Sequence, residues 1–338
     1  MSEPTPQEVM EATNVTHLSP WFEQQLRGAI SRYEFRDVAT ISKHRDRIVE
    51  ELGRHRQTSG RNRVVIGISG GLDSALVAAL FKAAGWHVDG LLLPIHQNAA
   101  ETERGHELCS ALRINPREID LSDEYDYLAS WLENPKANGV SEAPEMRLRM
   151  GNIRARMRMI ALYDRAQAVG GVVASTDNLS EFTAGFWTLH GDVGDIAPIQ
   201  ALNKSWDVPV MAAMMQVPQA IIRAVPTDGL GISGSDEDQL GCRYLEWDIV
   251  MYRLLLEQMR NASAPEDVDE MISKIVQHAD EEDVAKVGRI VTRMRSTAHK
   301  HKNPHNYDHK IIGPYPGVLE AVARLAATLN PSYGVGTG

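Results

Sequence analysis

The stretch VVIGISGGLDSALVAAL, residues 64–80, decides the fold, because it joins two regular patterns through a pair of adjacent glycines. Its first part is a short apolar run rich in β-branched residues, which is typical of a buried parallel strand. Its last part places Leu76 and Leu80 one helical turn apart. Gly70 and Gly71 between these parts let the backbone turn tightly. The sequence therefore predicts a strand, a glycine turn and a helix in direct succession.

The alternation of strand and helix continues on the carboxyl side of this stretch. Apolar runs predict strands at 88–94, 117–121 and 171–175. Helical spacing predicts one helix at 101–112 and a long one between residues 143 and 169. Parallel strands joined by helices form right-handed crossovers, so we expect an α/β fold with a doubly wound parallel sheet. Such sheets bind their ligands beyond the carboxyl ends of the strands.

Both ends of the chain are predicted to be helical additions to this sheet. Residues 1–60 show amphipathic helical spacing, and we interpret them as an N-terminal helical segment and a candidate dimer contact. Residues 61–312 form the predicted nucleotide-binding domain, in which the charged residues 264–297 are a helical insertion. The tail, 313–338, is rich in Pro and Gly at its ends and is expected to be poorly ordered.

Composition excludes several classes of protein. The formal charge of −10 argues against a nucleic-acid partner, which usually meets a basic face. No stretch approaches 18 uninterrupted apolar residues, and the polar N-terminus lacks a signal-peptide pattern, so no membrane contact is expected. Cys109 and Cys242 form no CxxC pair, and a chain of 338 residues needs no disulfide framework. We therefore expect a cytoplasmic protein.

The glycine turn has the features of a phosphate-binding loop. The backbone N–H groups of a Gly-Gly turn can approach an anion closely, and the start of the following helix adds positive partial charge. Ser69 and Ser74 can donate hydroxyl hydrogen bonds, and Asp73 can hold Mg²⁺. The stretch matches neither the Walker A pattern, which needs GK[ST], nor GxGxxG. A capped helix after an ordinary glycine turn is the plainer interpretation.

Residues 69–74, SGGLDS, resemble the signature of the ATP-pyrophosphatase (PP-loop) family, which cleaves ATP between its α- and β-phosphates. Over residues 45–312 the chain further resembles the ammonia-dependent type of the NAD synthetase family. This resemblance implies a PP-loop fold, a homodimer and the ATP-dependent amidation of deamido-NAD to NAD by ammonia. An adenylate intermediate and release of AMP and pyrophosphate are implied with it. The resemblance rests on Lys204 and on six blocks in the family's order: GNIRARMRM (151–159), STDNLSE (175–181), GFWTLHGDVGDIAPI (185–199), PTDGL (226–230), SDEDQLG (235–241) and HKHKNP (299–304).

The resemblance implies a site for ATP and Mg²⁺. Asp73 and Glu181 match the family's Mg²⁺ ligands, and two carboxylates completed by phosphate oxygens suit that ion. Lys204 matches an ATP-contacting lysine, which can neutralise the departing pyrophosphate in the reaction. A strand-to-helix cap is the plainer interpretation of Thr176. The positions that match ATP contacts are Gly67, Ser69, Gly70, Gly71, Asp73, Ser74, Thr176, Lys204 and Thr227.

A second set of residues matches contacts to the acid substrate. It consists of Arg156, Asp195, His299 and Lys300. Asp192 and Asp195 match positions near the nicotinic acid carboxylate, where one of them can accept a proton from ammonium. Taken alone, these residues also suit surface salt bridges and ordinary turns. Four histidines at 299, 301, 305 and 309 suggest a metal tract, which the absence of a nearby cysteine disfavours.

Two departures from the family pattern leave the substrate open. Leu189 stands where related synthetases have a lysine that touches the dinucleotide. One fewer residue also separates Gly191 from Pro198. A PP-loop adenylating ligase that acts on a different nucleotide or carboxylic acid is therefore the main alternative.

The source of nitrogen and the class of protein also have alternatives. Cys109 and Cys242 follow no amidase domain, which favours free ammonia over glutamine delivered by a separate glutaminase subunit. A tRNA-modifying enzyme would need a basic face or a catalytic cysteine pair, and neither is visible. A non-catalytic nucleotide sensor would tolerate the loss of Asp73 or Glu181, yet both are present.

Overall fold

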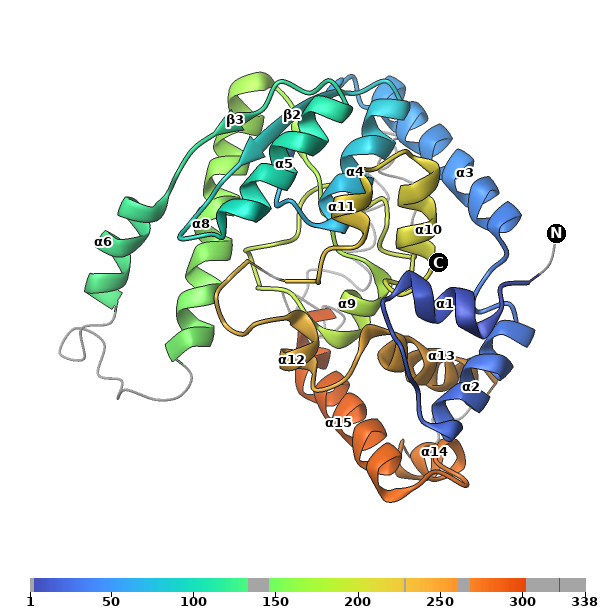
Figure 1. The fold of residues 1–338 in the computed structure, drawn as a ribbon. Coiled ribbons are helices and arrows are strands. Elements are labelled where there is room, and N and C mark those ends of the chain that lie inside the picture. The colour runs from blue at the N-terminus through green and yellow to red at the C-terminus, as the bar shows by residue number, and fades with distance from the viewer. Residues whose placement is uncertain (1–2, 133–145, 228, 261–267, 302–321, 323–338) are drawn as a thin grey trace.

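A computed structural model of the chain describes residues 3–132, 146–227, 229–260, 268–301 and 322 (Figure 1). At its centre is a four-stranded sheet in the order β3-β2-β1-β4. Every pair of neighbouring strands is parallel, which confirms the predicted sheet. The strands are β1 (Arg63–Gly67), β2 (His87–Leu92), β3 (Arg117–Glu118) and β4 (Val172–Val173).

The two outer strands are shorter than the sequence predicted. Each lies at an edge of the sheet and has a neighbour on one side only. Beyond β3, the N–H of Ile119 still donates to Leu92 O over 2.9 Å, but no regular ladder follows. Beyond β4, Ala174 pairs with Ile196 through an isolated bridge. The chain therefore leaves both edges early and continues into loops.

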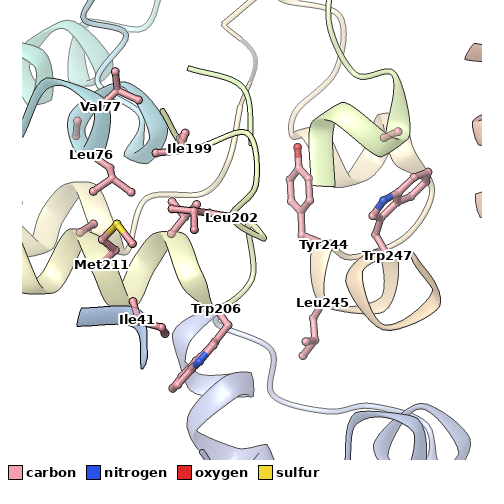
Figure 2. Packing of buried hydrophobic residues seen from close by; sticks show 14 of the residues in the cluster. Ile41, Leu76, Val77, Ile199, Leu202, Trp206, Met211, Tyr244, Leu245 and Trp247 are labelled. Atoms are coloured by element: carbon pink, nitrogen blue, oxygen red, sulfur yellow. The ribbon is translucent and has the colours of Figure 1, made fainter. Parts of the chain in front are cut away.

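Helices cover both faces of the sheet, as expected for a doubly wound fold. Because successive side chains of a strand point to opposite faces, Val64 and Val65 belong to different core clusters. Val64 packs in the cluster that contains Leu76 of the helix after the glycine turn, and Val65 in the cluster that contains Leu162. Figure 2 shows Leu76 of this helix close to Met211, which belongs to a further helix packed on it. On the sheet itself lie α4 (Leu72–Ala83) and α5 (Ala99–Ala111) on one face and α8 (Met146–Val169) on the other. Outside them, α3 (Val38–Thr58), α10 (Asp207–Met214) and α11 (Gln219–Ile222) pack on α4, and α6 (Ser122–Leu132) packs on α8.

The N-terminal helices α1 (Pro6–Ala12) and α2 (Pro20–Ser31) pack against the C-terminal half of the molecule. α2 lies against α13 (Tyr244–Arg260). Phe22 is fully buried, and Trp21 Nε1 donates to Gln277 O over 3.2 Å. The predicted helices are confirmed, but their apolar face is covered by the same chain. The dimer contact suggested for residues 1–60 stays a prediction.

The chain after Trp206 is mostly helical, as predicted. α14 (Val268–Ile275) packs on α13, and α15 (Glu281–Thr297) packs on α9 (Leu179–Ala184). Buried side chains of both helices join the main core, so the described part of the predicted insertion, 268–297, is integrated in the fold. The remaining elements are α12 (Asp236–Leu240) and the 3₁₀ helix η1 (Ala298–His301).

Two expectations concern parts of the chain that the structure barely covers. The tail, 313–338, lies outside the described residues except for residue 322. The domain boundaries predicted at 60, 61, 312 and 313 stay predictions.

Among the described helices, none has the length and apolar character needed to cross a membrane.

Candidate functional site

A cavity of about 950 Å³ lies at the carboxyl ends of the central strands. Ile68 after β1, Leu93 after β2 and Thr176 after β4 form its sheet side. Helices α9, α12, α13 and α15 supply residues of its wall. This position is where open α/β sheets bind their ligands. The sequence-predicted residues that line it are Gly67, Ser69, Gly71, Asp73, Ser74, Thr176, Glu181, Asp192, Lys204, Thr227 and Lys300.

The glycine loop lines the cavity, and no side chain caps the helix that follows it. Gly71 is the N-cap of α4, and no side chain accepts from the first turn. The plainer interpretation, a capped helix after a glycine turn, would not by itself explain why the N–H groups of this turn lack a side-chain acceptor. Ser69 Oγ and Ser74 Oγ are 3.0 Å apart beside this turn. Uncapped N–H groups, two hydroxyls and the helix dipole together favour a phosphate group.

Gly70 shapes the loop from outside the cavity wall. Its φ is +80°, in the left-handed region that favours glycine. A Cβ at this position would lie 2.1 Å from the carbonyl oxygen of Glu101. The Nε of Arg104 donates to Gly70 O over 3.1 Å and ties the loop to α5. Only glycine fits here, which agrees with a role in bringing the backbone close to a ligand.

Lys204 joins the two carboxylates that the sequence assigns to Mg²⁺. Its Nζ contacts Asp73 Oδ2 and lies 3.3 Å from Glu181 Oε1. Burial lowers the pKa of Lys204, but the surrounding acids, Asp73 first, raise it more strongly. Burial raises the pKa of Glu181 well above its usual value, although Lys204 opposes the shift. Asn178 Nδ2 donates to Asp73 Oδ1 over 3.0 Å and fixes the other side of that carboxylate.

Acidic groups outnumber the lysine in this part of the cavity. Asp177 and Asp236 are both buried and line the cavity with Asp73 and Glu181. Burial, the negative charge of Asp192 and that of Asp73 raise the pKa of Asp177 to about 7. Such an excess of carboxylate suits a divalent cation. Among the described residues no three acidic, His or Cys groups form a ready-made metal cluster. Asp73 and Glu181 therefore fit an Mg²⁺ ion whose other ligands are phosphate and water.

The long helix α8 presents a different arginine from the predicted one. Arg158 lines the cavity, and its guanidinium donates to Leu93 O over 3.0 Å and Gly229 O over 3.1 Å. Arg156 lies outside the cavity lining, and its Nε donates to Leu189 O over 3.2 Å. Residues of α8 that face the cavity follow helical spacing, and position 156 is off that face. The substrate contact assigned to Arg156 stays a prediction.

The two loop aspartates are separated by the structure. Asp192 lines the cavity, and its Oδ2 accepts from the backbone N–H of Thr188 over 2.5 Å. Asp195 lies outside the lining. Its carboxylate accepts from Tyr163 Oη over 2.9 Å and from Val173 N over 2.8 Å. Asp195 therefore fastens the loop to β4 and α8, and of the two aspartates only Asp192 lines the cavity.

The His-Lys pair is also divided. Lys300 lines the cavity and donates to Gly185 O over 2.7 Å and Trp187 O over 2.6 Å. Burial and the charge of Arg293 lower the pKa of Lys300. His299 is exposed and its ring contacts Ser296 O. Of the suggested histidine tract, positions 305 and 309 lie outside the described residues.

Several cavity residues carry no local sequence signal. Asp177 lies within the STDNLSE block, but nothing in the block distinguishes it as a cavity residue. Tyr244 and Arg293 come from α13 and α15, which reach the site through tertiary packing.

Comparison with known proteins agrees with this geometry. The family model described as NAD synthase matches residues 45–304. The chain is 32% identical to the NH(3)-dependent NAD(+) synthetase of Pyrococcus horikoshii, over 80% of this chain and 98% of that protein. It is 38% identical to the enzyme of the same name from Finegoldia magna, over 54% of this chain and 73% of that protein.

Solved structures show the same fold. The NMN synthetase of Francisella tularensis has a TM-score of 0.63 at 25% identity, covering 79% of this chain and 98% of that one. The NH3-dependent NAD synthetase of Campylobacter jejuni has a TM-score of 0.59 at 24% identity, covering 79% and 98% of the two chains. With the glycine loop, the acid pair and the lysine in one cavity, and with a family match over most of its length, the chain belongs to the NAD synthase family.

Proposed function

We propose that this protein makes NAD by the ATP-dependent amidation of deamido-NAD with ammonia. One observation carries the proposal: an uncapped glycine loop and the Asp73–Lys204–Glu181 cluster face the same cavity. The first is suited to a pyrophosphate and the second to a metal-bound nucleotide. The relatives named NH(3)-dependent NAD(+) synthetase support the choice of substrate and nitrogen source.

The first half-reaction activates the acid. A carboxylate oxygen of the substrate attacks the α-phosphorus of ATP, and the bond to the bridging oxygen of pyrophosphate breaks. The loop N–H groups, the hydroxyls of Ser69 and Ser74 and the ammonium of Lys204 stabilise the leaving pyrophosphate. Mg²⁺, held by Asp73 and Glu181, supplies positive charge to the phosphate oxygens when it is bound.

The second half-reaction forms the amide. Ammonia attacks the activated acyl carbon, a proton leaves the nitrogen, and the bond to AMP breaks. Asp192 faces the cavity and can receive this proton, as the sequence predicted. Asp177 is a second candidate, since its pKa of about 7 allows it to exchange a proton near neutral pH. Either carboxylate can also hold ammonium before it is deprotonated.

A second candidate substrate is the mononucleotide acid, whose amidation gives NMN. A solved structure with a similar fold is called NMN synthetase. Leu189 replaces the lysine that related enzymes use on the dinucleotide. Arg156, Asp195 and His299, which the resemblance assigned to the substrate, lie outside the described lining of the cavity. A smaller substrate would need fewer of these contacts.

The oligomeric state and location are part of the same proposal. We propose a cytoplasmic homodimer. Ile160 and Tyr163 on α8 and Tyr127 and Trp131 on α6 are exposed apolar residues that a second copy can cover. Cys109 and Cys242 are both free thiols in this structure, as suits a reducing compartment. Light scattering on the purified protein tests the dimer.

The decisive experiment incubates the protein with Mg-ATP, an acid and a nitrogen donor. Deamido-NAD and nicotinate mononucleotide are compared as acids, and ammonium and glutamine as donors. The expected products from deamido-NAD and ammonium are NAD, AMP and pyrophosphate. Preference for the mononucleotide would select the second candidate, and activity with glutamine that depends on an added glutaminase would identify a separate subunit. Release of ADP would overturn the proposal.

A further inference from the structure

A buried carboxylate lies close to the residues of the cavity but does not line it. Asp248 of α13 is fully buried and is not among the described residues that line the cavity. Its Oδ1 accepts from Ser180 Oγ. Its Oδ2 accepts from Ser205 Oγ and, over 3.1 Å, from Ser205 N. Three donors on one carboxylate make a fixed junction between α13, α9 and the loop before α10.

The residues held by this junction are the immediate neighbours of the site's charged groups. Ser180 precedes Glu181, and Ser205 follows Lys204. Ser180 Oγ also accepts from the backbone N–H of Lys204 over 2.9 Å. A single carboxylate therefore sets the backbone positions of both Glu181 and Lys204.

The same helix contacts the far end of the lysine. Tyr244 lies one turn before Asp248 on α13, and the Lys204 ammonium is 5.4 Å from the centre of its ring. Tyr244 Oη also contacts Asp236 Oδ2 over 3.3 Å. α13 thus fixes the backbone of Lys204 through Asp248 and faces its ammonium with Tyr244.

We propose that Asp248 is a positioning residue for the adenylation step, which rests on the proposed function. It touches no substrate and acts by holding Lys204 and Glu181 at the separation that nucleotide and metal require. Small displacements of such groups are costly, since misplacement by about 1 Å can reduce rates about 100-fold. Burial raises the pKa of Asp248 to about 7, against the pull of its serine donors, so an uncharged residue would occupy the space at a lower solvation cost. Its retention here is explained by the geometry that it imposes.

Asp248→Asn tests this inference. Asparagine has one acceptor oxygen, so one serine hydroxyl would have to change from donating to Asp248 to accepting from the new amide group, which rearranges the junction. We expect kcat for AMP release to fall about 10- to 100-fold, while KM for the acid changes less than about threefold, because the substrate pocket itself is untouched. In the Asp248→Asn background, Ser205→Ala should add little further loss, because both changes break the same junction.

The control is a buried carboxylate of the same kind outside the site. Asp283 is buried near the start of α15 and accepts from Ser19 Oγ over 2.7 Å. Asp283→Asn is expected to lower the melting temperature and leave kcat unchanged. Equal loss of kcat in both variants, or unchanged kcat in Asp248→Asn, would overturn the inference. Should Asp248→Asn fail to fold, Ser205→Ala alone is measured, and it must lower kcat.

The two proposals fail in distinguishable ways. If the wild-type protein releases no AMP with either acid, the proposed function is wrong. If the wild-type protein is active and Asp248→Asn behaves like Asp283→Asn, only the positioning role is wrong.

Discussion

The ammonium of Lys204 contacts the carboxylates of Asp73 and Glu181 and lies 5.4 Å from the centre of the Tyr244 ring. Without that charge, two acids would face each other in a buried place, where repulsion is weakly screened. The lysine therefore stabilises the arrangement that the metal and the nucleotide later use. This is a property of single residues, and it can be tested one residue at a time.

We expect Lys204→Met to unfold at a lower temperature than the wild-type protein when Mg²⁺ is absent. Added Mg²⁺ should raise the melting temperature of the variant more than that of the wild type, because the ion relieves the repulsion between Asp73 and Glu181. Turnover should fall about 10²- to 10³-fold, the usual effect of removing one charge-stabilising donor. Thermal melting with and without MgCl₂ gives the first result, and AMP release gives the second.

Lys286→Met provides the matched control, since its ammonium pairs with Glu246 over 2.9 Å outside the cavity lining. Its loss of stability should be insensitive to Mg²⁺. A wild-type protein and a Lys204→Met variant that respond equally to Mg²⁺ would exclude the metal assignment of the acid pair.

The buried carboxyl group of Asp207 should make the free energy of unfolding depend on pH. Burial raises its pKa from 3.8 to about 6, against the opposing effect of Arg36 and the N–H of Asn203. The folded state then binds a proton that the unfolded state releases near pH 4, so wild-type stability falls as the pH rises from about 4 to 6. At about 1.4 kcal/mol per pKa unit, the change is about 3 kcal/mol.

Asp207→Asn removes this titration. The unfolding free energy of the wild-type protein minus that of the variant should therefore decrease by about 3 kcal/mol between pH 4 and pH 7. Chemical denaturation at a series of pH values measures it, and the difference cancels the groups that both proteins share. A difference that is constant with pH would show that the carboxyl titrates normally.

At the residue scale, the sequence predicted the groups that belong to local motifs and missed those that do not. Asp73, Glu181 and Lys204 lie together as the family resemblance implied. The same resemblance assigned Asp195 to the substrate, but its carboxylate accepts hydrogen bonds from Val173 N and Tyr163 Oη. A motif shows which residue types occur near a site, whereas the direction of each side chain depends on contacts that are remote in sequence.

At the scale of elements, the glycine loop and α4 were predictable because strand, turn and helix follow each other directly. The rotation of α8 about its axis was not. In the sequence of this helix the apolar positions show little periodic segregation, and arginines lie among them. The sequence therefore predicted the helix and its length, and the choice between Arg156 and Arg158 needed the packed structure.

Gly70→Ala tests the loop as an element. Gly70 and Gly60 both have positive φ, of +80° and +68°. A Cβ at Gly70 would meet Glu101 O at 2.1 Å, whereas a Cβ at Gly60 would meet nothing within 4 Å. Gly60→Ala should therefore cost only the left-handed conformation, about 1–2 kcal/mol. Gly70→Ala should cost more and should also raise KM for ATP, because the loop must move.

The comparison of the two alanine variants isolates the steric clash from the backbone preference. Unfolding free energies and KM for ATP are measured for both. A Gly70→Ala protein with the stability of Gly60→Ala and an unchanged KM would show that the loop is not fixed against α5.

At the scale of the whole molecule, the sequence predicted a parallel sheet with helical additions but not how the two ends of the chain meet. The family match begins at residue 45, so α1 and α2 lie before it. These two helices nevertheless share one core with the helices α13, α14 and α15, and α2 packs on α13. Contacts between residues more than 200 positions apart leave no local pattern in a single sequence. Amphipathic helices show that an apolar face is buried, but not against which partner.

Phe22→Ala tests whether the apolar face of α2 packs within the chain or forms a dimer contact. Phe22 is fully buried and meets the Trp21 ring edge-on, with centroids 4.9 Å apart. If the face packs within the chain, truncation creates a cavity and should cost about 3–5 kcal/mol in unfolding free energy, with no change in the association state. If the face is a dimer contact, the variant should dissociate more easily on dilution.

Tyr33→Ala, at a position 65% exposed just after α2, is the control and should change neither the unfolding free energy nor the association state. Denaturant unfolding together with light scattering over a dilution series separates the outcomes, and dissociation without loss of monomer stability would contradict the packing described here.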